Sequence, residues 1–451
     1  MNSRKIPHNV GLLTLTESFM NNPTTERRIR VLHISYACSP FENSEPAVGW
    51  NRAIECAREC DVWVICCEEF REPIERYLQS NQLPESLRIV FVGSTAHAAV
   101  MRLPGLFYLG YRMWHARAIR EAERLHKKHD FEIVHQVNLC GFREPGYGRK
   151  LGIPLVWGPV GGTQNFPTRF FLTAGILGGT VEVLRTIANR FQLRFSRRVR
   201  KTLLDAERII AANTTNKRDL ERRAQHRIEQ FFEAGTNPQT DVAKCFEDRN
   251  ELKIVWSGRL EAWKAFPLVL RALSQLPPDF PFSVRVIGDG SRRKSWERLA
   301  KSLGIADRID WRGGMLIEQA RAEFEWGDVL VFSSLRDTTG SALFQALEVG
   351  LPVICFDHQG ARDIIDERCG IKLKVETPKQ AVRDLANAFE ELHNNPEQLS
   401  VLHRGALERA AEISWKSIGR QVVDIYKQIT KTDDDTLPIE VLPTDLQTVD
   451  R

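Results

Sequence analysis

Two cations lie five residues apart where a strand gives way to a helix. In SGRLEAWKAF, Arg259 directly follows an apolar strand and Lys264 comes near a helix start. A guanidinium and an ammonium beside the free N–H groups of a helix N-terminus suit a diphosphate, because all of these groups carry positive charge. The pattern therefore predicts a site for an anionic ligand, although a pair of solvated surface charges would read the same way.

A glycine-bearing turn follows the next strand of the same series. In VIGDGS, Gly288 and Gly290 would allow the backbone to approach a ligand closely. Such turns are common between a strand and a helix, so this one is weak evidence by itself. We expect it to lie beside the two cations.

The stretch VLVFSSLRDTTGSALFQALEVGLPVICF (329–356) places polar groups between an apolar strand and an apolar helix. Asp337 and Gln345 bracket three residues that can present backbone N–H groups as the helix begins: Thr339, Gly340 and Ser341. The alternative is a simple helix cap formed by Asp337 or Thr339. Ligands of parallel sheets bind at the carboxyl ends of strands, so we expect these groups to face a ligand.

The elements that position these groups alternate between short apolar strands and amphipathic helices. One series begins with RVLHISY (30–36) and ends with RIIAAN (208–213), and a second begins with LKIVWSGR. This alternation predicts an α/β fold with parallel sheets, built as two doubly wound domains that face each other across a cleft. The predicted division is a flexible extension over 1–28, a first domain over 29–236, a linker over 237–250, a second domain over 251–413, a C-terminal helix over 414–431 and an acidic, disordered tail over 432–451.

Composition limits the class of protein. The chain has 451 residues, 42% of them apolar and 27% charged, and its net charge is +5. These values predict two or three globular domains and allow an anionic ligand or membrane surface without requiring one. The nine cysteines form no Cys-x-x-Cys pair, so we expect no metal site, and we expect reduced, mostly buried thiols in a cytoplasmic protein. We find no signal-peptide core and no apolar run of about 18 residues that would span a membrane.

Four motifs in the second series occur together with a recognisable order and spacing. They are Gly258-Arg259-Leu260 with Lys264, Gly288-Asp289-Gly290, Asp337 with Gln345, and Gly350-Leu351-Pro352-Val353. Over about residues 250–365 the chain resembles the retaining group 1 (family 4) glycosyltransferases, whose GT-B fold consists of two facing Rossmann-like domains. The resemblance implies a nucleotide-sugar donor bound by the second domain, with Gly258 and the glycine-bearing turn near the donor.

Two positions depart from the pattern of that family. Asp337 stands where the family usually has Glu and would contact the donor sugar, whereas Gln345 stands where a second Glu would hold the ribose hydroxyls. An amide loses the charge-assisted hydrogen bonds of a carboxylate, worth roughly 1–2 kcal/mol. The alternative function is therefore a catalytically weakened homologue that binds a nucleotide or glycan as a partner subunit.

The first series carries a matching glycine-bearing loop. ACSPFENSEPAVGWN (37–51) resembles the loop of bacterial exopolysaccharide-type members. The resemblance implies that Gly49 faces the donor phosphates and that Glu45 and Asn51 lie near the acceptor. The alternative is an ordinary loop between a strand and a helix.

Two further segments of the first series fit the same subgroup. IVHQVN places His135 at a strand end, where the family often has a His facing the cleft, and makes Gln136 and Asn138 pocket residues by the same resemblance. A packed structural His is equally compatible with the sequence. In WGPVGGTQ (157–164), the backbone of Gly161 and Gly162 would line the acceptor side.

The resemblance implies transfer with retention, by front-face attack of an acceptor hydroxyl, with no metal ion and no cofactor. Arg259 and Lys264 would hold the leaving diphosphate, and His135 and Asp337 would contact the sugar. The acceptor would be a glycan or a lipid-linked glycan. A basic amphipathic segment over 181–201 suggests peripheral contact with the inner membrane, although a solvated helix is the commoner explanation. We do not expect nucleic-acid binding, and the absence of Gly-x-Gly-x-x-Gly after the first strand disfavours an NAD-dependent enzyme.

Overall fold

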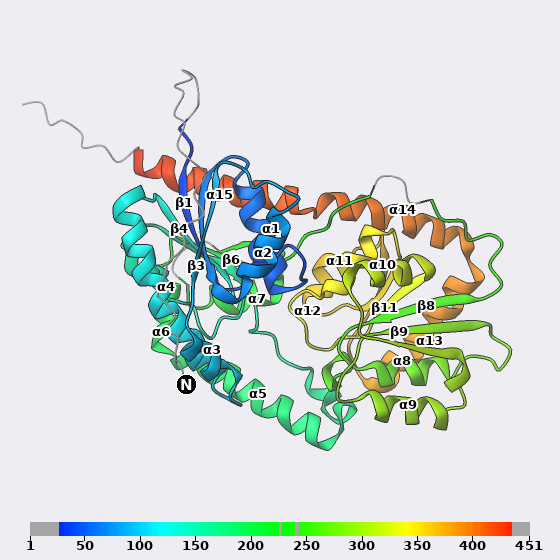
Figure 1. The fold of residues 1–451 in the computed structure, drawn as a ribbon. Helices are drawn as coiled ribbons and strands as arrows, with labels where there is room; N and C mark the ends of the chain where they lie inside the picture. Colours follow the sequence, from blue (N-terminus) through cyan, green and yellow to red (C-terminus); the bar gives the residue numbers. More distant parts are fainter. Residues whose placement is uncertain (1–26, 225–227, 240–242, 435–451) are drawn as a thin grey trace, which may run out of the picture.

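The computed structural model describes residues 27–224, 228–239 and 243–434. It contains two parallel sheets, each with helices on both faces, which confirms the predicted fold class (Figure 1). The predictions about the N-terminal extension and most of the tail fall outside the described residues. All nine cysteines are free thiols, and all of them except Cys245 are buried, as expected.

The first sheet has seven strands in the order β3-β2-β1-β4-β5-β6-β7, and all neighbours pair in parallel. The strands are β1 (Arg30–Ser35), β2 (Asp61–Cys67), β3 (Leu87–Val92), β4 (Ile133–Asn138), β5 (Leu155–Val160), β6 (Arg208–Ala211) and β7 (Ile228–Gln230). Both faces of β4 are buried along its whole length. Continuous apolar strands are typical of a sheet that helices cover on both sides.

Seven helices and three short 3₁₀ segments connect these strands. The helices are α1 (Glu45–Cys56), α2 (Arg71–Leu78), α3 (Thr95–Arg102), α4 (Phe107–His129), α5 (Gly175–Phe195), α6 (Arg197–Asp205) and α7 (Thr214–Glu221), and the 3₁₀ segments are η1 (Glu68–Phe70), η2 (Gly148–Leu151) and η3 (Thr168–Ala174). The single helical pattern expected after residue 181 is divided at Ser196, whose side chain caps α6 by accepting the N–H of Val199.

The second sheet has six strands in the order β10-β9-β8-β11-β12-β13, again all parallel. Its strands are β8 (Leu252–Ser257), β9 (Phe282–Ile287), β10 (Ile309–Gly313), β11 (Val329–Phe332), β12 (Val353–Phe356) and β13 (Gly370–Leu373). The helical segments are η4 (Ala262–Lys264), α8 (Phe266–Leu273), α9 (Arg293–Ser302), η5 (Ala306–Arg308), α10 (Ile317–Trp326), α11 (Ser341–Glu348), α12 (Gln359–Ile364), α13 (Pro378–Asn394) and α14 (Pro396–Glu412).

The last helix, α15 (Trp415–Asp434), returns to the first domain, a choice that the sequence left open. It packs against α1, and five of its side chains join the core of the first sheet: Val422, Val423, Ile425, Tyr426 and Ile429. Two of the segments in which the chain passes between the domains, one at Thr236 and one at Ser414, lie side by side, because these two residues form a parallel bridge. Figure 1 shows α15 along the top of the first domain.

The chain also crosses between the domains around η3. Phe166, Phe170 and Ala174 belong to the hydrophobic core of the second domain, although the sequence assigned them to the first. The helix α5 then runs back along the lower edge of the molecule in Figure 1. By length and composition the segment Thr168–Phe195 is apolar enough to cross a membrane, so the expectation of no such segment is wrong by this measure.

Each sheet has a switch point, where successive strands are added on opposite sides of the first strand. It lies between β1 and β4 in the first sheet and between β8 and β11 in the second. Loops after such strands diverge and leave room for a ligand at the carboxyl edge. Most of the predicted site residues lie in or after these strands, and the others follow the neighbouring strands β5 and β9.

Candidate functional site

Glycines bring the loops after β8 and β9 into contact. A Cβ on Gly288 would lie 2.1 Å from the carbonyl oxygen of Gly258, and one on Gly290 would lie 2.6 Å from that of Leu260. The backbone of Gly288 has φ of 121°, a region that favours glycine. These glycines therefore set the close approach of the two loops, whereas their contact with a donor stays a prediction.

Lys264 and Asp337 form the centre of the predicted donor site. Lys264 Nζ donates to Asp337 Oδ2 at 2.5 Å and lies 5.2 Å from the ring centre of Phe332. The Lys264 side chain is only 13% exposed. The structure thus brings together two residues 73 positions apart in sequence, as the predicted convergence of loops requires.

Arg259 is placed differently from Lys264. Its side chain is 75% exposed, with its guanidinium 5.7 Å from the ring centre of Trp263. Arg336 lies over the same indole ring at 4.7 Å. Arg259 can therefore move toward a ligand, whereas Lys264 is fixed.

The start of α11 carries the uncapped helix terminus that the sequence predicted. Gly340 is the N-cap residue, and no described side chain caps this terminus. Gly340 has φ of 103°, and a Cβ there would lie 2.5 Å from the Phe332 ring. The N–H groups of the first turn and the helix dipole therefore remain suited to an anion.

Two of the predicted residues of this helix have different environments. Thr339 is buried and its hydroxyl donates to the carboxylate of Glu233, whereas Ser341 is exposed. Gln345 is half-buried one helical turn after Ser341, on the same side of α11. Its assignment to the ribose stays a prediction.

The residues predicted at the end of β4 form a structural network. The amide of Asn138 donates to the carbonyl oxygens of Ala37 at 2.7 Å and Glu45 at 2.9 Å. The Glu45 carboxylate accepts the N–H of Cys140 at 2.9 Å, and burial raises the pKa of Glu45. Asn138 thus joins the loop after β1 to β4, and its pocket role stays a prediction.

His135 has the packed position that the sequence also allowed, and its contact with the sugar stays a prediction. It is fully buried, its Nδ1 pairs with the Tyr426 hydroxyl, and its Nε2 lies 2.8 Å from the Gly158 carbonyl oxygen. Burial lowers the pKa of His135 to about 3, with Arg52 contributing. Both ring nitrogens are occupied inside the protein in this arrangement.

Gln136 is likewise interior. It is 3% exposed, and its Nε2 donates to the carbonyl oxygen of Asn138 at 2.8 Å. Its predicted place in the pocket stays a prediction. Asn51 donates to the carbonyl oxygen of Ala47 in its own helix at 3.0 Å, and its acceptor role stays a prediction.

Gly49 has a packing role that the sequence did not reveal. A Cβ at this position would lie 2.1 Å from the Ala37 carbonyl oxygen and 2.4 Å from Ser35 Oγ. Only a residue without a side chain lets α1 lie this close to the end of β1. Its contact with donor phosphates stays a prediction.

Gly161 meets the second domain directly. A Cβ on Gly161 would lie 2.5 Å from Thr338 Cγ2, so the acceptor-side turn and the predicted donor turn touch. Gly162 has φ of 83°, and its N–H donates to Gln164 Oε1 at 3.0 Å. The two predicted halves of the site are therefore adjacent.

Amide side chains of the first domain hold the turn that carries Asp337. Gln164 Nε2 donates to Thr338 Oγ1 at 2.7 Å, and Asn213 Nδ2 donates to the Thr338 carbonyl oxygen at 2.7 Å. Gln359 accepts the N–H of Asp337 at 2.9 Å and donates to the carbonyl oxygen of Asn165 at 2.8 Å. Sequence reasoning missed these amides, because no local pattern distinguishes an interdomain amide from a surface one.

Arginines of three segments gather beside this junction. Arg336 forms a two-pronged ion pair with Glu182 of α5 at 2.8 and 3.0 Å, which locks the turn to that helix. Burial, together with the nearby Arg336 and Arg143, lowers the pKa of Arg185 to about 10. Arg143 lies close to Gly162, so an excess of positive charge borders the acceptor side.

Glu233, after β7, is a further residue that the sequence analysis missed. It accepts a hydrogen bond from Thr339, and burial raises its pKa to about 7, with Glu45 adding to the rise. It therefore links the interdomain connection to the start of α11. Its signal in the sequence, one of two Glu residues in EQFFEAGTN, is not distinctive.

The raised pKa of Glu233 predicts a pH dependence of stability. Because the folded-state pKa lies above the ordinary value of 4.5, the folded state holds its proton more tightly, and this stabilisation is lost as pH rises through about 7. Glu233→Gln has no ionisable group at this position, so its stability should not show this decrease with rising pH. From pH 5.5 to 8, we expect the free energy of unfolding of the native chain to fall by about 1–3 kcal/mol relative to the variant, measured by urea denaturation.

The exposed Glu247→Gln variant is the matched control and should follow the native chain at both pH values. Parallel pH profiles for the native chain and Glu233→Gln would contradict the assigned ionisation.

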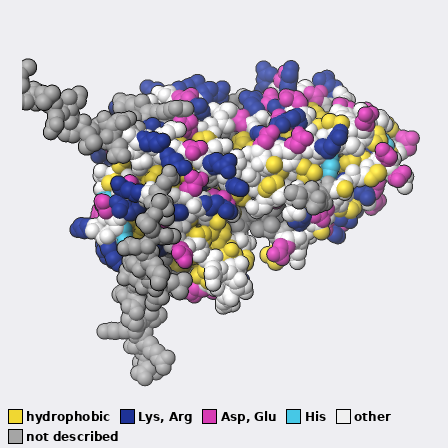
Figure 2. Space-filling model, turned by 90° about the horizontal axis from the view of Figure 1, so that it is seen from above, with side chains coloured by type: hydrophobic (Ala, Val, Ile, Leu, Met, Phe, Trp, Pro, Cys, Tyr) yellow, Lys and Arg dark blue, Asp and Glu magenta, His cyan; other side chains and the backbone are white. Residues whose placement is uncertain are grey.

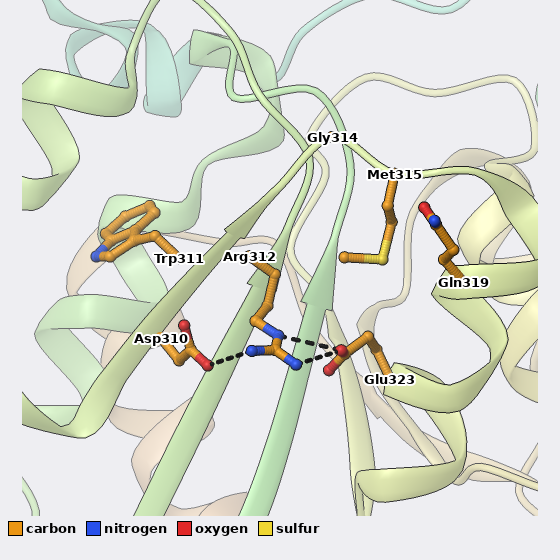
Figure 3. Close-up of a pocket in the computed structure, with 7 residues that line it drawn as sticks. All are labelled: Asp310, Trp311, Arg312, Gly314, Met315, Gln319 and Glu323. Atoms are coloured by element: carbon orange, nitrogen blue, oxygen red, sulfur yellow. Dashed lines mark hydrogen bonds and ion pairs between the residues drawn. The ribbon is translucent and has the colours of Figure 1, made fainter.

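A separate pocket of about 420 Å³ lies beside the edge strand β10 (Figure 3). Arg312 reaches across it to Glu323 at 2.6 Å and to Asp310 at 3.1 Å. None of the predicted site residues lines it, and its lining has one cation, Arg312, paired with two carboxylates. In the part of the chain that the structure describes, no group of three or more His, Cys, Asp or Glu side chains could hold a metal ion.

The two Rossmann-like sheets and the junction of their loops define the GT-B fold. Solved structures with this fold include the lipopolysaccharide outer core galactosyltransferase WaaB, with a TM-score of 0.60, 15% identity, and coverage of 90% of this chain and 100% of that chain. Sucrose-phosphate synthase from Thermosynechococcus elongatus gives a TM-score of 0.62 at 14% identity, with coverage of 90% and 100%.

Sequence comparison finds a family model and curated relatives that match the second domain. Residues 239–409 match the family model described as glycosyl transferases group 1. The D-inositol 3-phosphate glycosyltransferase of Corynebacterium urealyticum is 25% identical over 181 residues, 38% of this chain and 42% of that protein. The putative colanic acid biosynthesis glycosyltransferase WcaL of Salmonella typhimurium is 23% identical over 185 residues, 40% and 45%. The matches thus span less than half the length of these relatives.

Proposed function

We propose that this protein is a glycosyltransferase that moves a sugar from a nucleotide-diphosphate sugar to a glycan or lipid-linked acceptor, in polysaccharide or glycolipid biosynthesis. The observation that carries the proposal is the Lys264–Asp337 pair beside the uncapped start of α11, against the acceptor-side turn of the first domain. The group 1 match of the second domain supports it.

The donor would lie along the carboxyl edge of the second sheet. Lys264 and the N–H groups at the start of α11 would stabilise the negative charge that develops on the diphosphate as it leaves. Asp337 would then contact the sugar. A GT-B neighbour, Alr3699/HepE from Anabaena, has been solved with UDP and with UDP-glucose at a TM-score of 0.56, which supports a nucleotide donor for this fold.

We propose transfer with retention and without a metal ion. The acceptor oxygen would bond to the anomeric carbon on the face from which the diphosphate departs, and its proton would pass to a phosphate oxygen. The contacts of the first domain with Thr338 and Arg336 would keep the donor turn in place and exclude water from the reacting centre. Arg143 and Arg185 suit an acceptor that carries an anionic group.

Calorimetry with UDP, GDP and ADP tests the proposal. One of these nucleotides should bind, and the absence of heat from all three would reject a nucleotide-sugar donor. A donor screen with the sugars of the binding nucleotide then tests transfer. Chemical analysis of the product's anomeric configuration tests retention, and an inverted product would reject that part of the mechanism.

Arg259→Ala should weaken nucleotide binding by about three- to ten-fold, because the guanidinium is exposed and its charge is screened by solvent. The thermal unfolding midpoint should not change. Arg404→Ala, an exposed arginine on α14, is the control and should bind as the native chain does. If the two variants bound the nucleotide with equal affinity, Arg259 would not be part of the donor site.

A further inference from the structure

The outward face of α5 and of the preceding η3 is apolar along its whole length. Its large side chains are between 59% and 84% exposed: Leu172, Ile176, Leu177, Val181, Leu184, Ile187, Phe191 and Phe195. They recur at intervals of one to four residues and form one stripe of a helix about 30 Å long. Soluble proteins rarely expose an apolar surface of this extent unless something covers it.

The opposite face of α5 is bonded to the protein. Glu182 pairs with Arg336, and Asn189 Nδ2 donates to Asn165 Oδ1 at 3.1 Å. Both side chains are buried. A helix fixed to two domains on one side is arranged to lie on a membrane surface rather than to cross the membrane.

A second apolar segment extends the stripe. Leu103, Leu106, Phe107, Tyr108 and Leu109, which end α3 and begin α4, are between 38% and 52% exposed. Tyr108 is close enough to Arg185 of α5 to affect its pKa, so the two segments are neighbours. We call this combined surface, residues 103–109 and 172–195, the apolar face.

The charges next to the apolar face have one sign. Between residues 175 and 201 the chain has seven cations and one acid, and that acid is the buried Glu182. Exposed cations follow the apolar stripe at its C-terminal end: Arg190, Arg194, Arg197, Arg200 and Lys201. The face of the molecule in Figure 2, in contrast, intersperses acidic and basic side chains.

We propose that the apolar face docks on the surface of an anionic lipid bilayer, with its apolar side chains in the interface and the cations against lipid headgroups. This deepens the proposed function by giving the membrane contact a defined surface, and that surface extends beyond the segment 181–201 predicted from the sequence. Cations of one sign beside the apolar face complement an anionic surface, and we therefore take the bilayer rather than a second copy as its occupant.

The position of α5 gives this docking a consequence for the acceptor. Asn189 Nδ2 lies 3.4 Å from the carbonyl oxygen of Gly162, so the acceptor-side turn is one helix away from the apolar face. A sugar on a membrane-embedded lipid would therefore reach the junction of the domains without leaving the bilayer surface.

Vesicle co-sedimentation tests the docking. The full chain should sediment with vesicles of phosphatidylcholine containing about one third phosphatidylglycerol, and much less with phosphatidylcholine alone. Ile187→Glu with Phe191→Glu should weaken the partition by about ten-fold or more, and Arg190→Glu with Arg194→Glu by a similar factor that shrinks at high salt. The control is Leu316→Glu with Val401→Glu, two exposed apolar residues elsewhere, which should bind as the native chain does.

Each other outcome overturns the proposal. Equal binding by the Ile187/Phe191 variant and its control would show that the apolar face is not the docking surface. Equal binding to neutral and anionic vesicles would show that anionic lipid is not required. A dimer in light scattering that this variant converts to a monomer would assign the face to a second copy. Calorimetry with UDP, GDP and ADP separates this inference from the proposed function, because neither vesicle result depends on nucleotide binding.

Discussion

Lys264→Ala should lower the rate of sugar transfer by about 10²–10³-fold and weaken nucleotide binding, while the chain remains folded. The lysine is nearly buried, and its ammonium is the fixed cation next to the start of α11. A preorganised charge directed at a developing anion typically contributes this much to the rate. Steady-state kinetics with the identified donor, together with calorimetry of the nucleotide, measures both effects.

The control for Lys264→Ala must separate loss of the cation from exposure of an unpaired Asp337. Lys301→Ala, on the exposed surface of α9, should leave the rate unchanged. In Lys264→Ala with Asp337→Asn the unpaired charge is gone, and we expect nucleotide binding to stay weak. Recovery of nucleotide affinity in this double variant would show that Lys264 serves only to neutralise Asp337.

Gly340→Ala should both destabilise the second domain and abolish nucleotide binding. At φ of 103° an alanine is strained by about 1–3 kcal/mol, and its Cβ would lie 2.5 Å from the Phe332 ring. That ring lies beneath Lys264, so its displacement would disturb the cation as well. Thermal unfolding should show a midpoint several degrees lower, and calorimetry should show little or no heat.

Gly314→Ala is the matched control for the glycine substitution. No atom of the described chain lies within 4 Å of a Cβ at that position, and its backbone is not in the left-handed region. It should therefore retain both stability and binding. If Gly340→Ala bound nucleotide as well as Gly314→Ala does, the start of α11 would not be part of the donor site.

The four motifs of the second domain were predictable because each is local. A strand, a turn and a helix start within a few residues of one another, and the carboxyl ends of adjacent parallel strands must lie at one edge. The sequence thus placed Lys264 and Asp337 near each other, and their side chains meet at 2.5 Å. Gly161 and Thr338 are adjacent because the carboxyl edges of the two sheets face each other.

Some predicted site residues have surroundings that come from distant parts of the chain. His135 is the third residue of β4, and Tyr426, 291 residues later, lies against its ring and excludes solvent. Gln136 and Asn138 likewise bond to backbone groups inside the sheet and its first loop. A strand motif indicates which edge a side chain lies near and carries no information about which helix covers it.

By itself the sequence determined the strand and helix alternation, the two parallel sheets and the segments that meet at their carboxyl edges, because these depend on patterns within a few residues. Only the tertiary structure decided which of those side chains are accessible, the raised pKa of Glu233 and the apolar face of α5. Burial, desolvation and exposure are set by the packing of segments hundreds of residues apart, and such packing leaves no local pattern to recognise.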